Sequence, residues 1–338
     1  MRLYYIGQKL KSFGAFLVIL VFLPYITAVF VNGAGVRNEE SQPYVTVRTG
    51  QGGQEETGEV EWTEYLAGIL AREMSEEYED EALKAQAVLI RTGLYRTLSD
   101  SEDRILTEEY MTRSEMEKKW GGSFEQNYKK YTGAVRETDD AVLFYGETYA
   151  WTPFHQSSCG MTRSAEEVVG TEEYPYLRAK ECPLDKEADD EIQVFTYHYA
   201  EIQELCRDFL VAEDEKEQAE AGYAFDDFEI QSRDSAGYVK SLRIGNTVCT
   251  GDQFRDALSL PSSAFSFSES GEEMKITTTG IGHGLGMSQW TANEMAKEGS
   301  SWEEILQFFF EGTTVNREIQ ETELLSGTEE KYLTYSPI

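Results

Sequence analysis

Residues Phe13 to Val31 form an almost uninterrupted apolar run, which constrains this chain more than any other feature. A helix of about 20 apolar residues crosses the hydrocarbon core of a bilayer. Arg2, Lys9 and Lys11 precede the run and acidic residues follow it, which predicts a helix whose N-terminus lies in the cytoplasm. We therefore expect a single-pass protein of the cell membrane whose folded part lies on the extracytoplasmic side.

A cleaved signal peptide is the alternative for this segment. Gly33-Ala34-Gly35 offers the small residues at which a signal peptidase cuts. The apolar run is longer than a usual signal-peptide core, and this favours an uncleaved anchor. We assign residues 1–35 to a cytoplasmic stub and a transmembrane anchor.

The chain is strongly acidic. It has 62 Asp and Glu against 30 Lys and Arg, a formal charge of −32. This charge argues against a nucleic acid as partner, whereas a neutral polymer is not repelled. Four cysteines, Cys159, Cys182, Cys206 and Cys249, lie in the part expected to be exported, where disulfides form and three pairings are open.

Composition and periodicity divide the rest of the chain. Residues 36–60 are rich in Gly, Gln, Glu and Thr without helical periodicity, which predicts a flexible linker. A folded domain is expected over residues 61–322, followed by a polar tail over residues 323–338. Helical segments and short strands are mixed without regular βαβ alternation, so we predict an α+β fold whose elements form a substrate groove.

Two helices are expected at the start of the domain. Thr63 can cap the first, which runs to about Met74, and the polar residues Ser75 to Asp80 break it. The second helix is expected to bury one stripe of apolar side chains, while Lys84 and Arg91 point away from that stripe. The stripe consists of Leu83, Ala87, Ile90 and Leu94.

Later segments predict strands and further helices. Hairpins are expected to turn at Gly146-Glu147 and at Gly245-Asn246, the first one pairing 141–145 with 148–154. Residues Tyr199 to Leu210 are predicted to be helical. The N-caps predicted for three more helices are Asp252, Ser288 and Ser301.

Glu73 stands just before the break between the first two helices. A carboxylate at a helix end that faces a groove is partly desolvated, which raises its pKa and lets it donate a proton near neutrality. In a chain with 62 acidic residues, a solvated surface charge is the competing interpretation of any one glutamate.

Glycines alternate with larger residues from Gly280 to Gly286, and Met287-Ser288-Gln289 then opens a helix. Such a segment brings backbone N–H groups and the side chain of His283 close to a ligand. The spacing and the lysine of a phosphate-binding loop are absent. A tight structural turn is the alternative.

The segment Phe154 to Thr162 contains His155 and Cys159, and Cys182 follows. These residues supply three zinc ligands, with the fourth position left to His198, another side chain or water. The competing interpretations are a disulfide between the two cysteines, an ordinary buried thiol, and a Cys–His peptidase.

Taken in order, these segments resemble the stage II sporulation protein D family, whose members include membrane-anchored peptidoglycan lytic transglycosylases and amidase-enhancer-like proteins. The resemblance covers about Trp62 to Val315. Its specific parts are Glu73-Met74, Glu81 to Val88, Arg91-Thr92, Phe154 to Thr162, Tyr174 to Leu177, Leu260 to Phe265 and Gly282 to Gln289.

The resemblance implies cleavage of MurNAc–GlcNAc bonds in peptide-stripped glycan strands, with formation of 1,6-anhydroMurNAc ends. It also implies that Glu73, the glutamate of the Glu-Met motif, is catalytic. Some members bind zinc near the segment matched by His155 and Cys159, which keeps a zinc cofactor, with Cys182 as a further ligand, among the expectations. The residues expected to bind substrate are Lys84, Gln86, Arg91, His283, Gly284, Ser288 and Gln289.

The same resemblance suggests partners and a rival function. Expected partners are glycan strands, the membrane, a cell-wall amidase and other membrane-anchored sporulation proteins. The rival is a non-catalytic glycan-binding scaffold that stimulates the amidase. The sequence departs from the family pattern at Leu89-Ile90, Gly93, Met161 and Thr291, which bears on substrate preference and loop shape.

Overall fold

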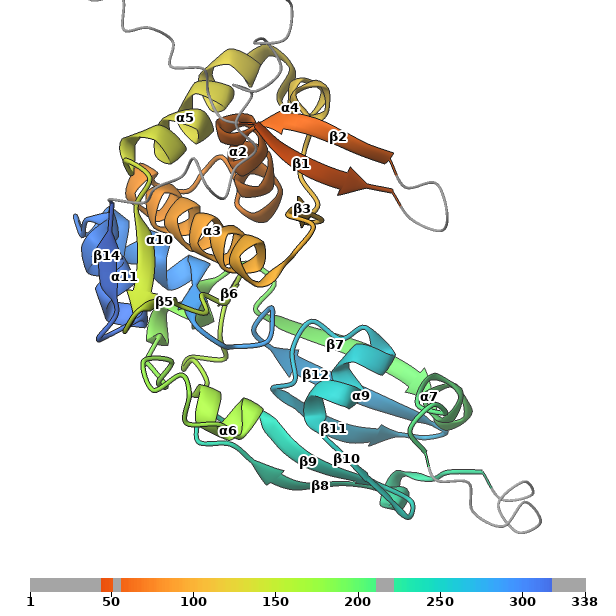
Figure 1. Ribbon diagram of the computed structural model, residues 1–338. Helices are drawn as coiled ribbons and strands as arrows, with labels where there is room; N and C mark the ends of the chain where they lie inside the picture. The colour runs from red at the N-terminus through yellow and green to blue at the C-terminus, as the bar shows by residue number, and fades with distance from the viewer. Residues whose placement is uncertain (1–43, 51–55, 211–221, 318–338) are drawn as a thin grey trace, which may run out of the picture. The chain divides into compact units, whose positions relative to one another are not determined.

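The computed structural model describes residues 44–50, 56–210 and 222–317 (Figure 1). The anchor predicted over Phe13 to Val31 and the tail over residues 323–338 lie outside this part of the chain. No helix within the described part is both long and apolar enough to cross a bilayer. Helices and short strands are mixed along the chain, so the α+β class is confirmed.

The elements are short apart from α3. The helices are α2 (Trp62–Glu73), α3 (Asp80–Asp100), α4 (Arg113–Trp120), α5 (Phe124–Glu137), α6 (Ala165–Val169), α7 (Tyr199–Leu205), α9 (Gly251–Leu258), α10 (Gln289–Lys297) and α11 (Trp302–Phe309), with 3-10 turns at Gly121–Ser123, Pro183–Glu187 and Phe225–Asp227. The strands are β1 (Tyr44–Thr49), β2 (Glu56–Glu61), β3 (Ile105–Leu106), β4 (Val142–Tyr145), β5 (Thr148–Tyr149), β6 (Phe154–His155), β7 (Ile192–His198), β8 (Phe228–Arg233), β9 (Val239–Ile244), β10 (Thr247–Cys249), β11 (Phe265–Ser270), β12 (Glu273–Thr279), β13 (Met287–Ser288) and β14 (Thr314–Asn316). The sheet orders are β2-β1-β3, β14-β4-β5, β13-β6, β11-β12-β7 and β10-β9-β8.

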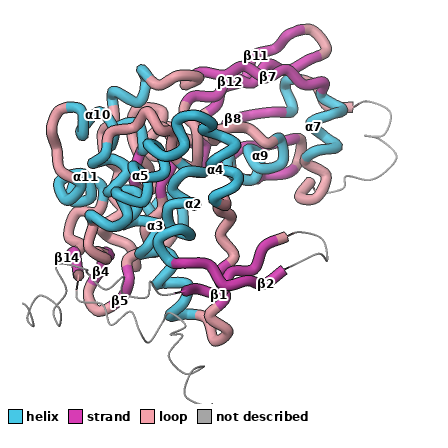
Figure 2. The backbone as a smooth tube through the Cα atoms, turned by 90° about the horizontal axis from the view of Figure 1, so that it is seen from above, coloured by secondary structure: helices cyan, strands magenta, loops and turns pink. Residues whose placement is uncertain are grey.

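A helical core surrounds α3, which contacts α2, α5, α10 and α11 (Figure 2). Its predicted stripe is buried: Leu83, Ala87, Ile90 and Leu94 are 0%, 1%, 6% and 2% exposed. Fully burying a side chain of this kind contributes about 1.5–3 kcal/mol. The helix α3 is therefore the scaffold against which the end of α2 and the start of α10 are fixed.

A second core is built from one continuous stretch of the chain between β6 and β13. The sheets β11-β12-β7 and β10-β9-β8 enclose it together with α7 and α9 (Figure 1). The fully buried Phe254 on α9 packs against Phe265 on β11, with ring centroids 5.3 Å apart. The helix α7 ends at Leu205, before the predicted Leu210, and the carbonyl of Cys206 accepts the N–H groups of Phe209 and Leu210 in the turn that follows.

The flexible linker predicted over residues 36–60 is wrong in its second half. The strand β1 pairs antiparallel with β2 and parallel with β3. Val45 and Val47 are buried while their neighbours are partly or fully exposed, which is the two-residue period of a strand. A search for helical periodicity misses this pattern, and the described fold begins at Tyr44 instead of near Glu61.

Two predicted N-caps are also wrong. Glu61 caps α2 in place of Thr63, because its carboxylate accepts the backbone N–H groups of Thr63 and Glu64 at 2.9 and 2.7 Å. Thr250 caps α9 in place of Asp252. The caps Ser288 and Ser301 and the turns at Gly146-Glu147 and Gly245-Asn246 are confirmed. Phe154, predicted to end the strand partner of 141–145, pairs instead with Met287.

Arg91 ties α3 to the end of α5. Its guanidinium is fully buried, and Nη1 donates to Thr138 Oγ1 and Ala141 O at 3.0 and 2.9 Å, while Nη2 donates to Val135 O at 2.7 Å. These acceptors include carbonyls at a helix C-terminus, which favour a cation. The predicted outward orientation and substrate contact of Arg91 are therefore wrong, and its role is structural.

We predict that Arg91→Met lowers the free energy of unfolding by about 3 kcal/mol, because buried acceptors of a charged donor lose their partner. The matched control is Arg207→Met, which removes an exposed ion pair with Glu204 and costs far less. Urea unfolding followed by circular dichroism measures both changes. Equal losses in the two variants contradict the structural role.

Candidate active site

The glycine-rich segment packs backbone to backbone against the segment that follows Trp151. Ser157 and Ile281 exchange two backbone hydrogen bonds of 3.1 and 2.9 Å. Gly282 has a φ of +116°, and a Cβ there would lie 2.6 Å from the Cβ of His155. At Gly286 a Cβ would lie 1.9 Å from the carbonyl oxygen of Pro153. Only glycine permits this approach, so the alternation of glycines has a structural cause.

This packing brings His155 and His283 together, with ring centroids 5.8 Å apart. Nδ1 of His155 donates to the carbonyl of Leu285 at 3.0 Å, since a carbonyl only accepts. Burial, reinforced by His283, lowers the pKa of His155 to about 3. Burial, with the nearby Arg255, lowers the pKa of His283 to about 4.

Both imidazoles are therefore neutral near pH 7. Nδ1 of His283 accepts the N–H of Leu285 at 3.0 Å. In the neutral His155 the other ring nitrogen, Nε2, is an acceptor, and it is buried without a partner among the described residues. His283 also lines a cavity of about 490 Å³ with Leu260, Pro261 and other residues.

Asp185 joins three segments in the interior. Its side chain is fully buried and accepts four hydrogen bonds: from Ser158 N–H (2.7 Å) and Oγ (2.5 Å), Ser288 Oγ (2.8 Å) and Thr291 Oγ1 (2.6 Å). It thereby fixes the first turn of α10 against the His155 segment. Sequence reasoning missed Asp185, because nothing in the sequence distinguishes it among the 62 acidic residues.

Glu73 is the last residue of α2, and its side chain is exposed. Although water reaches it, the surrounding protein partly desolvates the carboxyl and raises its pKa above the ordinary glutamate value, while Arg72 opposes this effect. The turn that follows is held in place: Met74 O accepts from the hydroxyl of Tyr131 at 2.7 Å, and Glu79 N–H donates to Asn293 Oδ1 on α10 at 2.8 Å. The position of Glu73 is thus set by α5 and α10.

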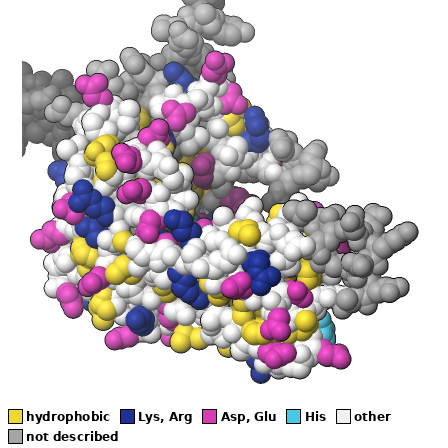
Figure 3. Space-filling view, turned by 90° about the horizontal axis from the view of Figure 1, so that it is seen from below, with side chains coloured by type: hydrophobic (Ala, Val, Ile, Leu, Met, Phe, Trp, Pro, Cys, Tyr) yellow, Lys and Arg dark blue, Asp and Glu magenta, His cyan; other side chains and the backbone are white. Residues whose placement is uncertain are grey.

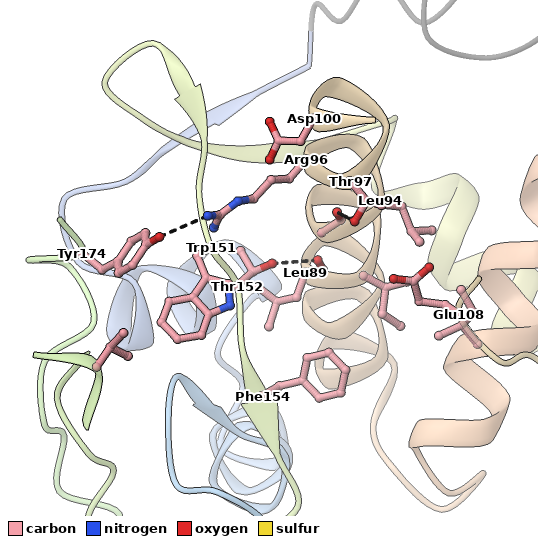
Figure 4. Close-up of a pocket in the computed structure, with 14 residues that line it drawn as sticks. Leu89, Leu94, Arg96, Thr97, Asp100, Glu108, Trp151, Thr152, Phe154 and Tyr174 are labelled. Carbon is pink, nitrogen blue, oxygen red and sulfur yellow. Dashed lines mark hydrogen bonds between the residues drawn. The ribbon is translucent and has the colours of Figure 1, made fainter. Parts of the chain in front are cut away.

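A cavity of about 560 Å³ begins one helical turn from Glu73 (Figure 4). Ile69 lies in its wall, and residues four apart share one helix face, about 6 Å apart along the axis. Trp151 and Phe154 line the opposite side, facing α3. His155 directly follows Phe154 in the chain, so the segment that carries the first histidine also borders the cavity.

The other residues expected to bind substrate are mostly held by protein. Lys84 Nζ pairs with Glu81 and Glu137 at 2.8 and 2.9 Å. Gln86 is fully buried and its Oε1 accepts from Nε2 of Gln289 at 3.3 Å, which couples α3 to α10. Two residues of the set remain. The backbone carbonyl of Gly284 accepts the backbone N–H of Arg163, and the hydroxyl of Ser288 donates to Asp185.

The structure does not bring the expected zinc ligands His155, Cys159 and Cys182 together. Cys159 Sγ donates to the carbonyl of Ala236 at 3.3 Å, and burial raises the pKa of Cys182 to about 12. No three His, Cys, Asp or Glu side chains of the described part are grouped to hold a metal ion. The described residues therefore do not group these three side chains as a zinc site, and zinc binding stays a prediction.

The cysteines also give no support to the peptidase or disulfide interpretations. All four are free thiols. Burial raises the pKa of Cys159, whereas a nucleophilic cysteine needs a lowered pKa. His198, the other zinc ligand considered, is exposed and lies 3.4 Å from Glu273.

Comparisons with known proteins match this arrangement to one family. The family model described as Stage II sporulation protein matches residues 50–145. Stage II sporulation protein D of Bacillus amyloliquefaciens is 31% identical over 264 residues, which cover 75% of this chain and 73% of that protein. The chain belongs to the stage II sporulation protein D family.

Two further relatives have similar coverage. Stage II sporulation protein D of Bacillus subtilis strain 168 is 31% identical over 264 residues, or 75% of this chain and 74% of that protein. A protein of Brachyspira hyodysenteriae, described as uncharacterized, is 29% identical over 258 residues, or 75% of this chain and 66% of its own length. Within this member of the stage II sporulation protein D family, the matched residues 50–145 include Glu73 and its turn.

Glu191 is a buried carboxyl beneath the glycine-rich segment. Its side chain accepts from Ser157 Oγ at 2.9 Å, and its carbonyl accepts the N–H of Gly280. The second side-chain oxygen, Oε1, has no partner among the described residues. Burial, aided by the charge of Asp185, raises the pKa of Glu191 to about 7.

We predict that Glu191→Gln becomes more stable relative to the unchanged protein as the pH rises from 5 to 8. Between about pH 4.5 and 7 the folded state keeps a proton at Glu191 that the unfolded state has released, so stability falls as pH rises through this window. Glutamine resembles the protonated carboxyl, so the variant does not lose folding stability through this group as the pH rises. Urea unfolding at both pH values measures the difference, and a constant difference contradicts the buried, shifted carboxyl.

Proposed function

We propose that this chain is a peptidoglycan lytic transglycosylase that uses Glu73 as its acid and base. The observation that carries the proposal is the place of Glu73: an exposed carboxyl with a raised pKa, one turn from an aromatic-lined cavity. An exposed carboxyl is within reach of a polymer. The raised pKa increases the fraction that is protonated near neutrality and able to act as an acid.

One carboxyl group is sufficient for this reaction. Protonated Glu73 gives its proton to the oxygen that links C1 of MurNAc to GlcNAc, and the C1–O bond breaks. The C6 hydroxyl of the same MurNAc attacks C1, and its proton passes to the Glu73 carboxylate. The ring closes as 1,6-anhydroMurNAc without consuming water, and Glu73 is restored, whereas a hydrolytic glycosidase needs a second carboxyl group.

The cavity beside Glu73 suits a glycan. Trp151, Phe154 and Tyr174 offer flat apolar faces of the kind that contact sugar rings. The neutral histidine pair adds hydrogen-bonding groups without charge. We assign to His283, which borders the neighbouring cavity, contacts with hydroxyl or acetamido groups of the strand.

The cellular setting is part of the proposal. The Bacillus relatives are named as stage II sporulation proteins, and we propose that this chain remodels the cell wall during sporulation. The helix predicted over Phe13 to Val31 would anchor it to the cell membrane with the catalytic part outside. Acidic side chains are spread over the face in Figure 3 and do not form one patch, and this surface suits a cationic partner such as an amidase.

A non-catalytic scaffold that binds glycan and stimulates an amidase is the second candidate. The observation that favours it is that Glu73 lies beside the cavity and is absent from the residues that line it. Glycan binding without any cleavage by the unchanged protein would establish this alternative.

We predict that Glu73→Gln reduces release of anhydro-sugars by at least about 100-fold, the usual size of a lost general acid–base step. The matched control, Glu77→Gln, removes an exposed carboxyl in the same turn and leaves the rate unchanged. Mass spectrometry of products from purified peptide-free glycan strands reads the result, since the anhydro product is one water lighter than a hydrolysis product. A normal rate in Glu73→Gln contradicts the proposal.

A further inference from the structure

A second cavity adjoins the one beside Glu73. It has a volume of about 570 Å³ and is walled by aromatic side chains, Phe144, Tyr145, Tyr149 and Tyr176. Arg96, Asp100 and Tyr174 line both cavities. Each volume lies in the range of small-ligand pockets. Because the two cavities share these three side chains, they are neighbouring sections of one groove.

Arg96 is the cation at the shared wall. Figure 4 shows its side chain reaching from α3 towards Tyr174, with Trp151 below it and Asp100 above. Its Nη2 donates to the hydroxyl of Tyr174 at 3.2 Å, and its guanidinium carbon lies 5.6 Å from the centre of that ring. The Tyr174 ring in turn packs against Trp151, with centroids 4.9 Å apart. These contacts hold the guanidinium in one place.

The guanidinium of Arg96 is not satisfied by the protein. Its Nη1 is shielded from bulk water and has no hydrogen-bond acceptor among the described residues. No Asp or Glu of that part of the chain forms an ion pair with it, although Asp100 and Glu108 also line the cavity. In a protein with 62 acidic residues, an arginine that keeps an unpaired, shielded donor calls for an acceptor from outside the chain.

We propose that Arg96 binds the carboxylate of the lactyl ether on a MurNAc ring lying in this groove. The proposal rests on the glycan substrate proposed above and names the group that selects it. A carboxylate matches the planar guanidinium donors, and aromatic faces on both sides suit the sugar that carries it. The acidic Asp100 accepts hydrogen bonds from sugar hydroxyl groups.

This contact supplies a physical cause for the preference for peptide-stripped strands that the family resemblance implies. A stem peptide is joined to the lactyl group through an amide, which removes the negative charge that Arg96 recognises. A strand with free lactyl groups satisfies the guanidinium, and a substituted strand leaves it unpaired. Arg96 is thus a specificity-determining residue, and Tyr174 positions it.

Binding to two matched glycans tests the assignment. Calorimetry measures the full chain carrying Glu73→Gln, which prevents cleavage, against peptide-free strands and against the same strands with their lactyl carboxylates converted to methylamides. We expect about 10- to 100-fold tighter binding of the free acid, the effect of one hydrogen bond to a charged group. Adding Arg96→Gln abolishes this preference, Arg96→Lys keeps part of it, and the control Arg207→Gln keeps all of it.

The outcomes separate the two proposals. Equal binding of both glycans by the protein with Arg96 overturns the assignment, even if Glu73-dependent cleavage holds. Absence of cleavage overturns the proposed function, while the binding preference still decides the role of Arg96. A collapse of the groove in Arg96→Gln weakens both glycans equally, so unchanged binding of the methylamide excludes a merely structural effect and supports the assignment.

Discussion

The buried carboxylate of Asp185 is the interaction on which the arrangement of the site depends. It accepts hydrogen bonds from the His155 segment and from the first turn of α10, so one side chain fixes both. From α10, Asn293 holds the turn after Glu73, and Gln289 contacts Gln86 on α3. Displacing Asp185 would therefore shift the proposed catalytic residue, the glycine-rich segment and the wall between them together.

Several ionisable side chains inside the site are held in their uncharged form, whereas the chain as a whole is strongly acidic. The chain carries −32 overall, yet its two central histidines are neutral through burial and Glu191 holds a proton up to about pH 7. Charged side chains nearby include Glu73 at the end of α2, Arg96 on α3, and Asp100 and Glu108 in the cavity wall. Acid–base work and carboxylate recognition are then assigned to two separate side chains, Glu73 and Arg96.

Short-range patterns in the sequence predicted the local structure well. The stripe on α3, the two hairpin turns and the caps of α10 and α11 follow from periodicity and turn chemistry within a few residues. The strand β1 escaped because its two-residue alternation is brief and lies among Gly and Gln. Glu73 was found through its motif, since the spacing alone does not distinguish it from a surface glutamate.

Contacts between distant segments could not be predicted in this way. Asp185 meets Ser288 and Thr291 across more than a hundred residues, and Arg91 meets acceptors about fifty residues away. The family resemblance suggested a substrate-binding arginine at Arg91, whereas burial of the guanidinium against helix-end carbonyls gives it a structural role. The separated zinc ligands show the same limit, because spacing in sequence does not fix which polar partners compete for each side chain.

The most direct test of the account is a crystal structure of Glu73→Gln with a peptide-free MurNAc–GlcNAc oligosaccharide. We expect the glycosidic oxygen that follows a MurNAc ring to lie within hydrogen-bond distance of the substituted side chain, with sugar rings running along Trp151 and Phe154. An oligosaccharide bound on another face, with no sugar near the end of α2, would contradict it.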